Sequence, residues 1–525
     1  MSSPISSIEG ETMENSKLSN LARKIKDKTL DRDIEKTRLL GYRSIDLIVD
    51  YLKNIDNMPI SPEKTFKQMI ELFYEPLPQN EQDPLLTMDE CREKIMKNAL
   101  RIGHPCFLGW TLPSGTATGA FADGIASAIN QNVAVSGACM ATAVELCVLR
   151  WIKELIGYDP NAGGILVSGG SNANLTALAV ARNVKADFNV PAVGMRQEKN
   201  MKIYASKEVH MCIPKAADLL GIGTDNISWV DVDKHYRMDS KDLEKKIQDD
   251  IGNEHYPFAV IATAGTVNTG AIDPLKSIAN ICHKHNLWFH IDAAYGGFAA
   301  MSKNLKPLLQ GIESADSVAL DPHKWLFIPY EAGCILIKNP SYMTQTFSMK
   351  THYIHLNDDV NSQDEEVDFS DYGLQLSRGF RALKIWMTLK HYGIKNLAQI
   401  IDQNVYLAQY FAEMLVKSID FELVTPVSLS VVCFRYVPND LKNKKDKDND
   451  YDKIEKYLSV LNKAILSALH KDGQALLSGT VLNSTFVLRI CIVNYRTKKN
   501  DLVRIIDSIR KLGRKEDKKF RPSVF

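Results

Sequence analysis

The chain has 525 residues, of which 45% are apolar and 24% are charged, and its formal net charge is +1. This length predicts two or three compact units, and the composition is that of a globular protein with a sizeable buried core. A net charge this close to zero provides no electrostatic footprint for nucleic acid or an anionic membrane, so we expect neither as a partner.

The first twenty residues are polar, and residues 1–18 are predicted to form a disordered tail. They lack the basic start and apolar middle of a secretory signal, and no apolar run in the chain is as long as a membrane span. The nine cysteines stand singly, without a Cys-x-x-Cys pair. Their odd number and irregular spacing predict reduced thiols and a cytoplasmic location.

Residues 19–114 are predicted to form an N-terminal helical segment. Apolar residues recur at helical spacing from Asp31 to Lys53, a further helix is predicted at 88–100, and proline-rich breaks separate them. The segment has too few apolar residues for a core of its own. We therefore expect it to pack on something larger, such as a second subunit.

Residues 115–395 are predicted to form a large α/β domain. Short apolar runs alternate there with helical stretches, and the predicted strands cover 165–167, 202–204, 258–261, 288–291, 317–320 and 334–337. Apolar strands separated by helices indicate a largely parallel sheet. Active sites of such sheets lie beyond the carboxyl ends of the strands, so the polar residues that follow each strand matter most.

The rest of the chain is predicted to form a long loop and a smaller domain. Residues 345–372 are polar and lack periodicity, and loops of this length are usually functional or disordered. A helix is predicted at about 378–392. Residues 396–525 are expected to form a small α+β domain with a charged insert at 441–453, whose run 442-KNKKDKDND-450 is interpreted as a solvated surface loop.

The strand end 168-SGGSNANLTAL-178 offers a possible phosphate site. Gly170 and Ser171 follow a strand and open a helix, where backbone N–H groups and the helix dipole favour an anion. An ordinary turn with Ser171 as the helix N-cap explains the stretch about as well. The stretch has neither the Walker lysine nor the GxGxxG spacing, so a nucleotide fold is not supported.

Two further strand ends carry Asp292 and Thr263. Asp292 closes an apolar strand, where a carboxylate needs a partner such as a cationic ring nitrogen, and the small Ala294 beside it leaves room for a flat ring. Taken alone, Asp292 would more often be a helix cap or half of a structural ion pair. Thr263 taken alone would be a turn hydroxyl.

The fourth strand end, 319-ALDPHKWLFIPY-330, contains Lys324. An apolar wall and neighbouring cations would lower the pKa of this lysine and free its amine as a nucleophile, and His323 could contact a phosphate. A lone lysine is more often a snorkelling side chain. A phosphate cradle, a strand-end carboxylate and a lysine 32 residues later are together what a pyridoxal phosphate enzyme needs.

At these residues the chain resembles the pyridoxal-phosphate-dependent group II decarboxylases, and most of all their aromatic-L-amino-acid decarboxylase branch. The family's Asn/Asp-Pro-His-Lys-Trp stands here as 321-DPHKW-325, its Asp-Ala-Ala-Tyr as 292-DAAY-295 and its Ala-Thr-x-Gly-Thr as 262-ATAGT-266. The resemblance runs from about residue 35 to the strand near Arg489. It implies an α/β fold of the fold-type I transferase kind, with a mostly parallel seven-stranded sheet, an N-terminal helical segment and a small C-terminal α+β domain.

The resemblance also implies roles around pyridoxal 5'-phosphate. Lys324 binds the cofactor aldehyde, Asp292 pairs with the pyridine nitrogen, His210 stacks on the ring, Ala294 lies on the opposite face, and Thr263 lies near the ring.

Gly170, Ser171, Asp321 and His323 fall where the family holds the phosphate. Asp321 replaces the commoner Asn, and an acid beside a phosphate is unfavourable unless it faces elsewhere. Ser377 matches a segment that the partner subunit contributes, which implies a homodimer with shared active sites.

Tyr353, in the long polar loop, resembles the tyrosine that protonates the substrate carbon after CO2 leaves, with His210 as a second candidate. A phenylalanine at that place accompanies aldehyde formation in the family, so Tyr353 favours simple decarboxylation. The catalytic residues implied are therefore Lys324, Asp292, His210 and Tyr353. No metal is expected, because the histidines lack ligand spacing.

The substrate is predicted to be an L-amino acid, with aromatic ones favoured by overall resemblance. Trp110 fits a pocket wall, Thr111 stands where aromatic decarboxylases often carry Phe, and Gln131 lies in a run of three amides where apolar residues are expected. An acidic or diamino acid such as aspartate, glutamate or diaminobutyrate stays open, and the amides could instead cap a helix or line a dimer seam. Tyr353 argues against an aldehyde-forming oxidase, and Lys324 argues against a non-catalytic scaffold.

Overall fold

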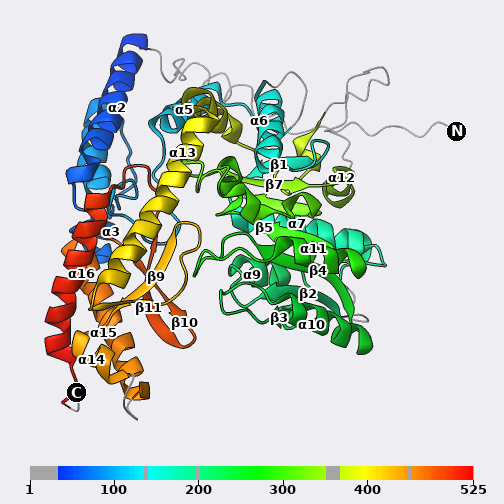
Figure 1. The fold of residues 1–525 in the computed structure, drawn as a ribbon. Helices are drawn as coiled ribbons and strands as arrows, with labels where there is room; N and C mark the ends of the chain where they lie inside the picture. Colours follow the sequence, from blue (N-terminus) through cyan, green and yellow to red (C-terminus); the bar gives the residue numbers. More distant parts are fainter. Residues whose placement is uncertain (1–32, 135–139, 196–199, 350–366, 446–450, 524–525) are drawn as a thin grey trace. The chain divides into compact units, whose positions relative to one another are not determined.

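The computed structural model describes residues 33–134, 140–195, 200–349, 367–445 and 451–523, and Tyr353 lies outside these ranges. The described chain divides into two units (Figure 1). The smaller unit comprises residues 33–54 and 63–99, and the larger comprises 55–62 and 100–523. Among the described residues, no helix combines the length and apolar character that crossing a membrane requires.

The smaller unit consists of the helices α2 (Ile34–Asn54), α3 (Phe66–Glu71) and α4 (Pro84–Glu90). Thr65 starts α3 with a reciprocal capping box to Gln68, and Asp83 caps α4 ahead of a proline in its first turn. The helix predicted at 88–100 is not regular, because α4 passes into a π turn at Cys91–Ile95 and a 3-10 turn at Met96–Asn98.

The larger unit is built on a seven-stranded sheet in the order β1-β7-β6-β5-β4-β2-β3. The strands are β1 (Gly163–Val167), β2 (Met201–Ser206), β3 (Ile227–Val230), β4 (Tyr256–Thr263), β5 (Trp288–Asp292), β6 (Ser317–Leu320) and β7 (Gly333–Ile337). β7 runs antiparallel to both of its neighbours, and all other pairs are parallel. The predicted mostly parallel seven-stranded sheet is therefore confirmed, although the sequence did not indicate β3.

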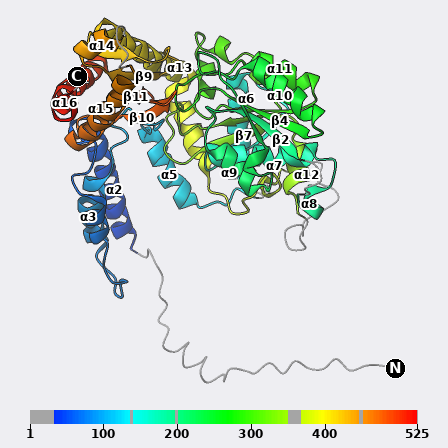
Figure 2. The same ribbon diagram turned by 90° about the horizontal axis from the view of Figure 1, so that it is seen from below.

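Helices cover both sides of this sheet. Their bounds are α5 (Ala117–Ile129), α6 (Met140–Ile156), α7 (Gly170–Lys185), α8 (Val190–Val193), α9 (Cys212–Leu219), α10 (Ser240–Gly252), α11 (Leu275–Lys284) and α12 (Ser341–Phe347). Figure 2 shows α10 and α11 on one side of the sheet and α7 and α9 on the other. α7 packs across β4 to β7, and its first turn lines one cavity with the residues at the carboxyl ends of β4, β5 and β6.

A second sheet, antiparallel and four-stranded, lies in the C-terminal part of the larger unit. Its order is β10-β11-β9-β8, with β8 (Phe421–Leu423), β9 (Val431–Tyr436), β10 (Ser478–Leu482) and β11 (Thr485–Cys491). The helices α14 (Asn439–Lys445), α15 (Tyr451–Asp472) and α16 (Lys499–Phe520) accompany it, and α15 and α16 pack on its strands. The prediction of a surface loop at 442–450 is thus wrong for residues 442–445, which belong to α14.

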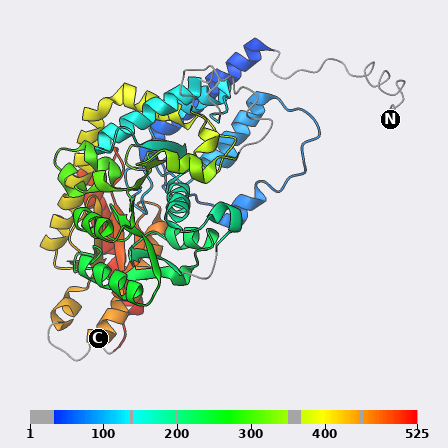
Figure 3. The same ribbon diagram turned by 90° about the vertical axis from the view of Figure 1, so that its right-hand side faces the viewer.

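One long helix, α13 (Arg381–Lys417), connects the two sheets. It is kinked at Gly393, whose φ of 69° and ψ of 152° interrupt the helix. In Figure 3 the region that holds the large sheet, cyan to green, faces the viewer. The predicted domain boundary after residue 395 falls just beyond the kink, and the domain assignment stays a prediction.

A buried ion pair fixes the start of this connection. Arg378 donates to the Glu145 carboxylate on α6 and to the carbonyls of Val133 and Leu166, and both charged side chains are almost fully buried. Burial raises the pKa of Glu145, and Arg378 works in the opposite direction. The pair therefore ties α6, β1 and the segment that leads into α13 to one another.

Replacing Arg378 by methionine should lower the free energy of unfolding by about 3–5 kcal/mol, because it leaves a carboxylate buried without its partner. Denaturant unfolding at fixed protein concentration measures this. Lys207→Ala is the matched control, since its partner Asp231 is exposed and the pair is screened by solvent, so stability should hardly change. Equal effects of the two substitutions would contradict the prediction.

Candidate active site

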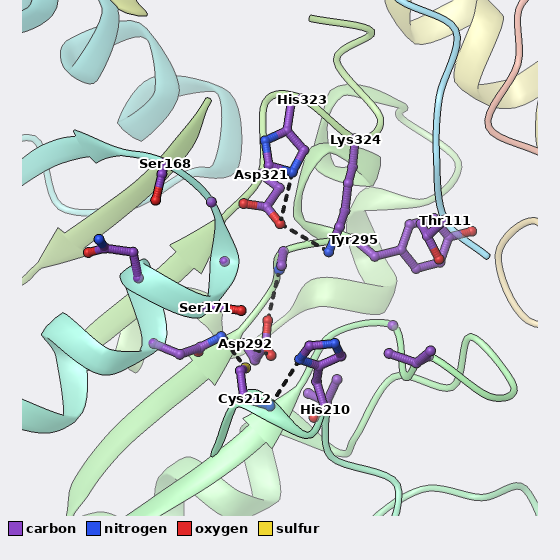
Figure 4. A pocket seen from close by; sticks show the side chains of 18 of the residues that line it. Thr111, Ser168, Ser171, His210, Cys212, Asp292, Tyr295, Asp321, His323 and Lys324 are labelled. Carbon is purple, nitrogen blue, oxygen red and sulfur yellow. Dashed lines mark hydrogen bonds and ion pairs between the residues drawn. The ribbon is translucent and has the colours of Figure 1, made fainter. Parts of the chain in front are cut away.

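Three neighbouring strands deliver polar side chains to one place. β4 ends at Thr263, β5 ends at Asp292, and Asp321 directly follows β6. These strand ends and the first turn of α7 line a cavity of about 350 Å³ (Figure 4). Its volume lies in the range of roughly 300–1,000 Å³ that small-molecule sites occupy.

Most of the predicted site residues line this cavity. Those that do are Thr111, Gly170, Ser171, His210, Thr263, Asp292, Ala294, Asp321, His323 and Lys324. Residues separated by more than two hundred positions in the chain thus meet in one site. The tertiary structure joins the four strand ends that the sequence could only propose one by one.

Of the predicted residues that the structure describes, three lie outside the lining: Trp110, Gln131 and Ser377. Trp110 is 48% exposed and donates its backbone N–H to Ser478 Oγ at 3.3 Å. Ser377 is exposed. Their substrate and cofactor roles stay predictions that depend on a second copy of the chain or on bound substrate.

The three amides that suggested a polar pocket have structural partners. Asn130 ends α5 in the left-handed conformation, with φ of 52°. Gln131 Oε1 accepts the Ala141 N–H at 3.1 Å, and Asn132 Oδ1 accepts the Arg378 N–H at 2.7 Å. Helix capping and the connection to Arg378 therefore account for these amides without a polar substrate.

The glycine turn before α7 packs tightly against the segment after β6. The N-cap of α7 is Gly169 and no side chain caps the helix, so the interpretation of Ser171 as N-cap is wrong. A Cβ on Gly170 would lie 2.8 Å from Asp321 Oδ2, and one on Gly169 would lie 3.0 Å from His323 Cε1. Only glycines allow this approach, which leaves an uncapped helix N-terminus facing the cavity.

Lys324 and Asp321 form an ion pair inside the cavity. Lys324 Nζ lies 3.0 Å from Asp321 Oδ2, and His323 Nε2 lies 3.6 Å from the same oxygen. Asp321 is 2% exposed, and its Oδ1 has no hydrogen-bond partner among the described residues. The acid that replaces the commoner Asn thus faces the lysine.

The predicted lowering of the lysine pKa is wrong for the chain without cofactor. Burial lowers the pKa of Lys324, but the carboxylates of Asp321 and Asp292 raise it by more than burial lowers it. The pKa of Lys324 therefore lies above its ordinary value. The sequence placed apolar residues and a histidine beside the lysine. The fold adds Asp292 from β5 and turns Asp321, three positions before the lysine, toward Nζ.

Asp292 is a buried carboxylate with few donors. It is 5% exposed, and it accepts the Ala294 N–H at 3.1 Å and Asn174 Nδ2 at 3.2 Å. Burial raises its pKa, and the charge of Lys324 works against that rise. A cation held against this carboxylate would therefore be strongly favoured.

His210 and Thr263 complete the polar lining. His210 Nδ1 accepts the Cys212 N–H at 3.2 Å, and burial lowers the pKa of the imidazole, which favours a neutral ring with its proton on Nε2. Asp273 Oδ2 accepts a hydrogen bond from the Thr263 backbone N–H at 2.8 Å. Thr263 Oγ1 is buried and has no partner among the described residues. The site thus keeps an unpaired hydroxyl for a ligand.

Sequence reasoning missed several lining residues, including Asn174, Cys212, Val267, Tyr295 and Glu331. Asn174 lies one turn into the helix that the glycine turn opens, so its polarity on the sheet-facing side was an available signal. Val267 and Glu331 lie in loops directly after the stretches 262-ATAGT-266 and 319-ALDPHKWLFIPY-330, but neither residue type by itself indicated a role in the cavity.

The lining fits pyridoxal phosphate. It offers an amine for an aldehyde at Lys324, a buried carboxylate for a ring nitrogen at Asp292, and the uncapped start of α7 for a phosphate. Two buried polar atoms there, Thr263 Oγ1 and Asp321 Oδ1, have no hydrogen-bond partner in the described part of the chain. Within the described ranges, no group of three or more His, Cys, Asp and Glu side chains is placed to hold a metal ion.

Comparisons with known proteins agree with this chemistry. The family described as "Pyridoxal-dependent decarboxylase conserved domain" matches residues 67–437. An aromatic-L-amino-acid decarboxylase of Bacillus atrophaeus is 35% identical over 486 residues, which cover 92% of this chain and 97% of that protein. A phenylacetaldehyde synthase of Arabidopsis thaliana is 28% identical over 88% of this chain and 92% of its own.

A solved structure described as Oryza sativa TDC with PLP and tryptamine has the same fold. It superposes with a TM-score of 0.85 at 25% identity, over 93% of this chain and 99% of that one.

Asp321→Asn should move the pH profile of cofactor capture to lower pH. The neutral amine is the form that attacks an aldehyde, and removing one carboxylate lowers the pKa of Lys324, so more neutral amine is present at a given pH. Absorbance after rapid mixing of the cofactor-free protein with pyridoxal phosphate gives the profile.

The matched control is Asp316→Asn, because Asp316 precedes β6 at the end opposite Asp321 and accepts the Phe289 N–H. It should leave the profile in place. If Asp321→Asn leaves the pH profile in place or moves it to higher pH, the ion pair does not set the protonation state of the Lys324 amine.

Proposed function

The chain belongs to the pyridoxal-dependent decarboxylase family, and from that membership we propose that it converts an aromatic L-amino acid to its amine and CO2. Pyridoxal 5'-phosphate is its cofactor. The observation that carries the proposal is the convergence of Lys324, Asp292 and the uncapped start of α7 on one cavity.

When bound, pyridoxal phosphate supplies an electron sink for the electron pair that the departing carboxylate leaves behind. Lys324 would hold its aldehyde, Asp292 its ring nitrogen, and the first turn of α7 with His323 its phosphate. Thr263 Oγ1 would donate to or accept from the ring substituents. Asp321 serves Lys324 in this proposal, because its carboxylate lies 3.0 Å from Nζ.

The chain's own residues manage the protons. Asp292 remains a carboxylate at the ring nitrogen, and Asp321 stabilises the charged form of Lys324, whose Nζ lies 3.0 Å from Asp321 Oδ2. His210 carries its proton on Nε2, beside the cavity. We assign the protonation of the substrate α-carbon to the Tyr353 hydroxyl, on the strength of the family motif, with His210 as the second candidate.

The charge of the lining supports a substrate without an acidic side chain. Among the described residues that line the cavity, Asp292, Asp321 and Glu331 are acidic, Lys324 is cationic, and none is an arginine. A side-chain carboxylate would meet mainly like charge there. This favours aromatic amino acids over aspartate and glutamate. A diamino acid is the second substrate class, because its second amino group would be attracted by the acidic residues of the lining.

We also propose that the active protein is a cytoplasmic homodimer with shared sites. Apolar side chains on one stripe of α2 are exposed, namely Leu39, Tyr42, Ile45 and Val49, and so are Phe66 and Phe73 of the same unit. A stripe of this kind is normally covered by a partner surface. The cytoplasmic assignment rests on the cysteines of the described residues, which are all free thiols.

A product screen over the twenty amino acids tests the function. The purified chain with pyridoxal phosphate should release an amine and CO2 from aromatic amino acids in preference to acidic ones. Lys324→Ala should lose the absorbance of the bound cofactor and lower the rate about a thousandfold or more, as loss of a covalent catalytic group does. Lys303→Ala, an exposed lysine, is the control, and absence of any amine product from the parent protein would refute the proposal.

Tyr353→Phe tests the choice between amine and aldehyde. If the tyrosine delivers the proton to the α-carbon, its loss should shift the product from amine to aldehyde, with O2 consumed and ammonia and hydrogen peroxide released. A coupled peroxidase assay and amine quantification measure the two outcomes side by side. An unchanged amine yield without peroxide would assign the proton to another group.

A further inference from the structure

A line of buried hydrogen bonds leads from the start of β5 to Asp292. The strand reads Trp288-Phe289-His290-Ile291-Asp292, and since side chains alternate along a strand, the first, third and fifth face the same side. That side is covered by α7, which carries Asn174. β6 pairs with β5 so that Ser317 stands beside His290.

Four residues form this line, which we term the β5 relay: Trp288, Ser317, His290 and Asn174. Trp288 Nε1 donates to Ser317 Oγ at 2.8 Å, and Ser317 Oγ lies 2.8 Å from His290 Nδ1. His290 Nε2 lies 2.6 Å from Asn174 Oδ1, and Asn174 Nδ2 donates to Asp292 Oδ2 at 3.2 Å. Every member is at most 2% exposed, so water does not compete for these bonds.

The two ends of the relay dictate the direction of every hydrogen bond in it. An indole N–H can only donate, and an ionised carboxylate can only accept. An ionised Asp292 therefore takes the Asn174 amide group and turns the Asn174 carbonyl oxygen to His290 Nε2. A neutral ring then accepts on Nδ1, to which Ser317, which accepts from Trp288, gives its own proton. His290 must then carry its proton on Nε2 and donate it to Asn174, whose amide protons are left for Asp292 and for Cys212 Sγ at 3.3 Å.

The opposite direction is incompatible with a charged Asp292. If His290 carried its proton on Nδ1, Asn174 would have to turn its amide group toward His290 and its carbonyl oxygen toward Asp292. Two acceptors would then face each other in a buried site, unless Asp292 took up a proton. The direction of the relay and the charge of Asp292 are thus coupled.

We propose that the β5 relay is a one-way chain of hydrogen bonds that positions Asp292 and keeps its carboxylate ionised. The inference rests on the proposed function, because Asp292 is assigned there to the ring nitrogen of the cofactor. Members of the relay act through Asp292 and touch neither substrate nor cofactor, apart from the edge of Asn174 that reaches the cavity.

The surroundings of the relay favour a fixed tautomer. Burial lowers the pKa of His290 to about 3, and its ring faces Ser317 and Asn174, which carry no charge. The charged or titratable groups near Asp292 are Lys324, His210 and Asp321, which approach it from the cavity, and Cys212, which receives a hydrogen bond from Asn174 at 3.3 Å and whose pKa burial raises to about 12. Since Cys212 stays a neutral thiol at neutral pH and no relay member forms a hydrogen bond to the other three groups, the tautomer of His290 reports on the relay directly.

The first test reads the histidine itself. The full-length protein, labelled with 15N in its histidines, is recorded by NMR with and without pyridoxal phosphate across neutral pH, and His290→Gln assigns the signal. We expect a neutral ring with the proton on Nε2 and an accepting Nδ1, unchanged across neutral pH. A proton on Nδ1, or a ring that titrates there, would overturn the proposal. This readout needs no cofactor, so it stands apart from a failure of the proposed function.

The second test removes relay members that are remote from the cavity. Ser317→Ala and, separately, Trp288→Phe should each weaken binding of pyridoxal phosphate about 2- to 10-fold, the factor that one net hydrogen bond represents. With pyridoxal phosphate labelled with 15N at its pyridine nitrogen, both variants should also shift the signal of that nitrogen toward the value of a less protonated pyridine. Two variants at different positions guard against a folding defect in either.

Ser228→Ala is the matched control, because Ser228 lies on β3 of the same sheet and donates to Asp250 at 2.9 Å, far from Asp292 in the strand order. It should change neither the affinity nor the ring-nitrogen shift. If the relay variants behave like this control, the β5 relay does not act on Asp292. If the parent protein binds no pyridoxal phosphate, the proposed function fails and the histidine signal alone decides the relay.

Discussion

A carboxylate buried at the end of a parallel strand is the constraint around which this site is arranged. Asp292 is 5% exposed, and burial raises its pKa, so its charge must be supported by donors or by a cation. The fold supplies two hydrogen-bond donors to Asp292, a backbone N–H and an asparagine amide. The remaining acceptor capacity of the carboxylate faces the cavity. The small residues that follow Asp292 keep that direction open, which is why the cavity lies where it does.

Among the described residues that line the same cavity, the acidic side chains outnumber the one lysine, so the charges of the lining do not balance without a ligand. Lys324 is paired with Asp321 at 3.0 Å, although a lysine that binds an aldehyde must be neutral when it attacks. The ion pair and the reactive form are therefore in competition, and a ligand that brings a phosphate to the start of α7 and a cationic nitrogen to Asp292 changes the electrostatics of both carboxylates. Asp321 is better explained as a partner of the lysine than as a phosphate ligand.

Much of the site could be predicted because its motifs are local. The strand ends, the glycine turn and the lysine each carry a short signature, and ten of the fourteen predicted residues line the cavity. The wrong predictions concern contacts rather than motifs. The pKa of Lys324 is raised rather than lowered, Gly169 takes the N-cap position offered to Ser171, and α14 occupies part of a segment expected to be a loop. Asp321 and Asp292 decide the pKa of Lys324, and only the folded backbone shows that both carboxylates face its amine.

The sequence by itself determined the fold class, most of the strands of the large sheet, and the residue types that a pyridoxal phosphate site requires, because periodicity and motif spacing are properties of the chain. Only the tertiary structure decided which groups face one another. Asn174 meets Asp292 across 118 positions, and His290 meets Ser317 across 27, because a sheet register and a helix packed upon it bring them together. Hydrogen-bond direction and protonation depend on such contacts, and no local pattern encodes them.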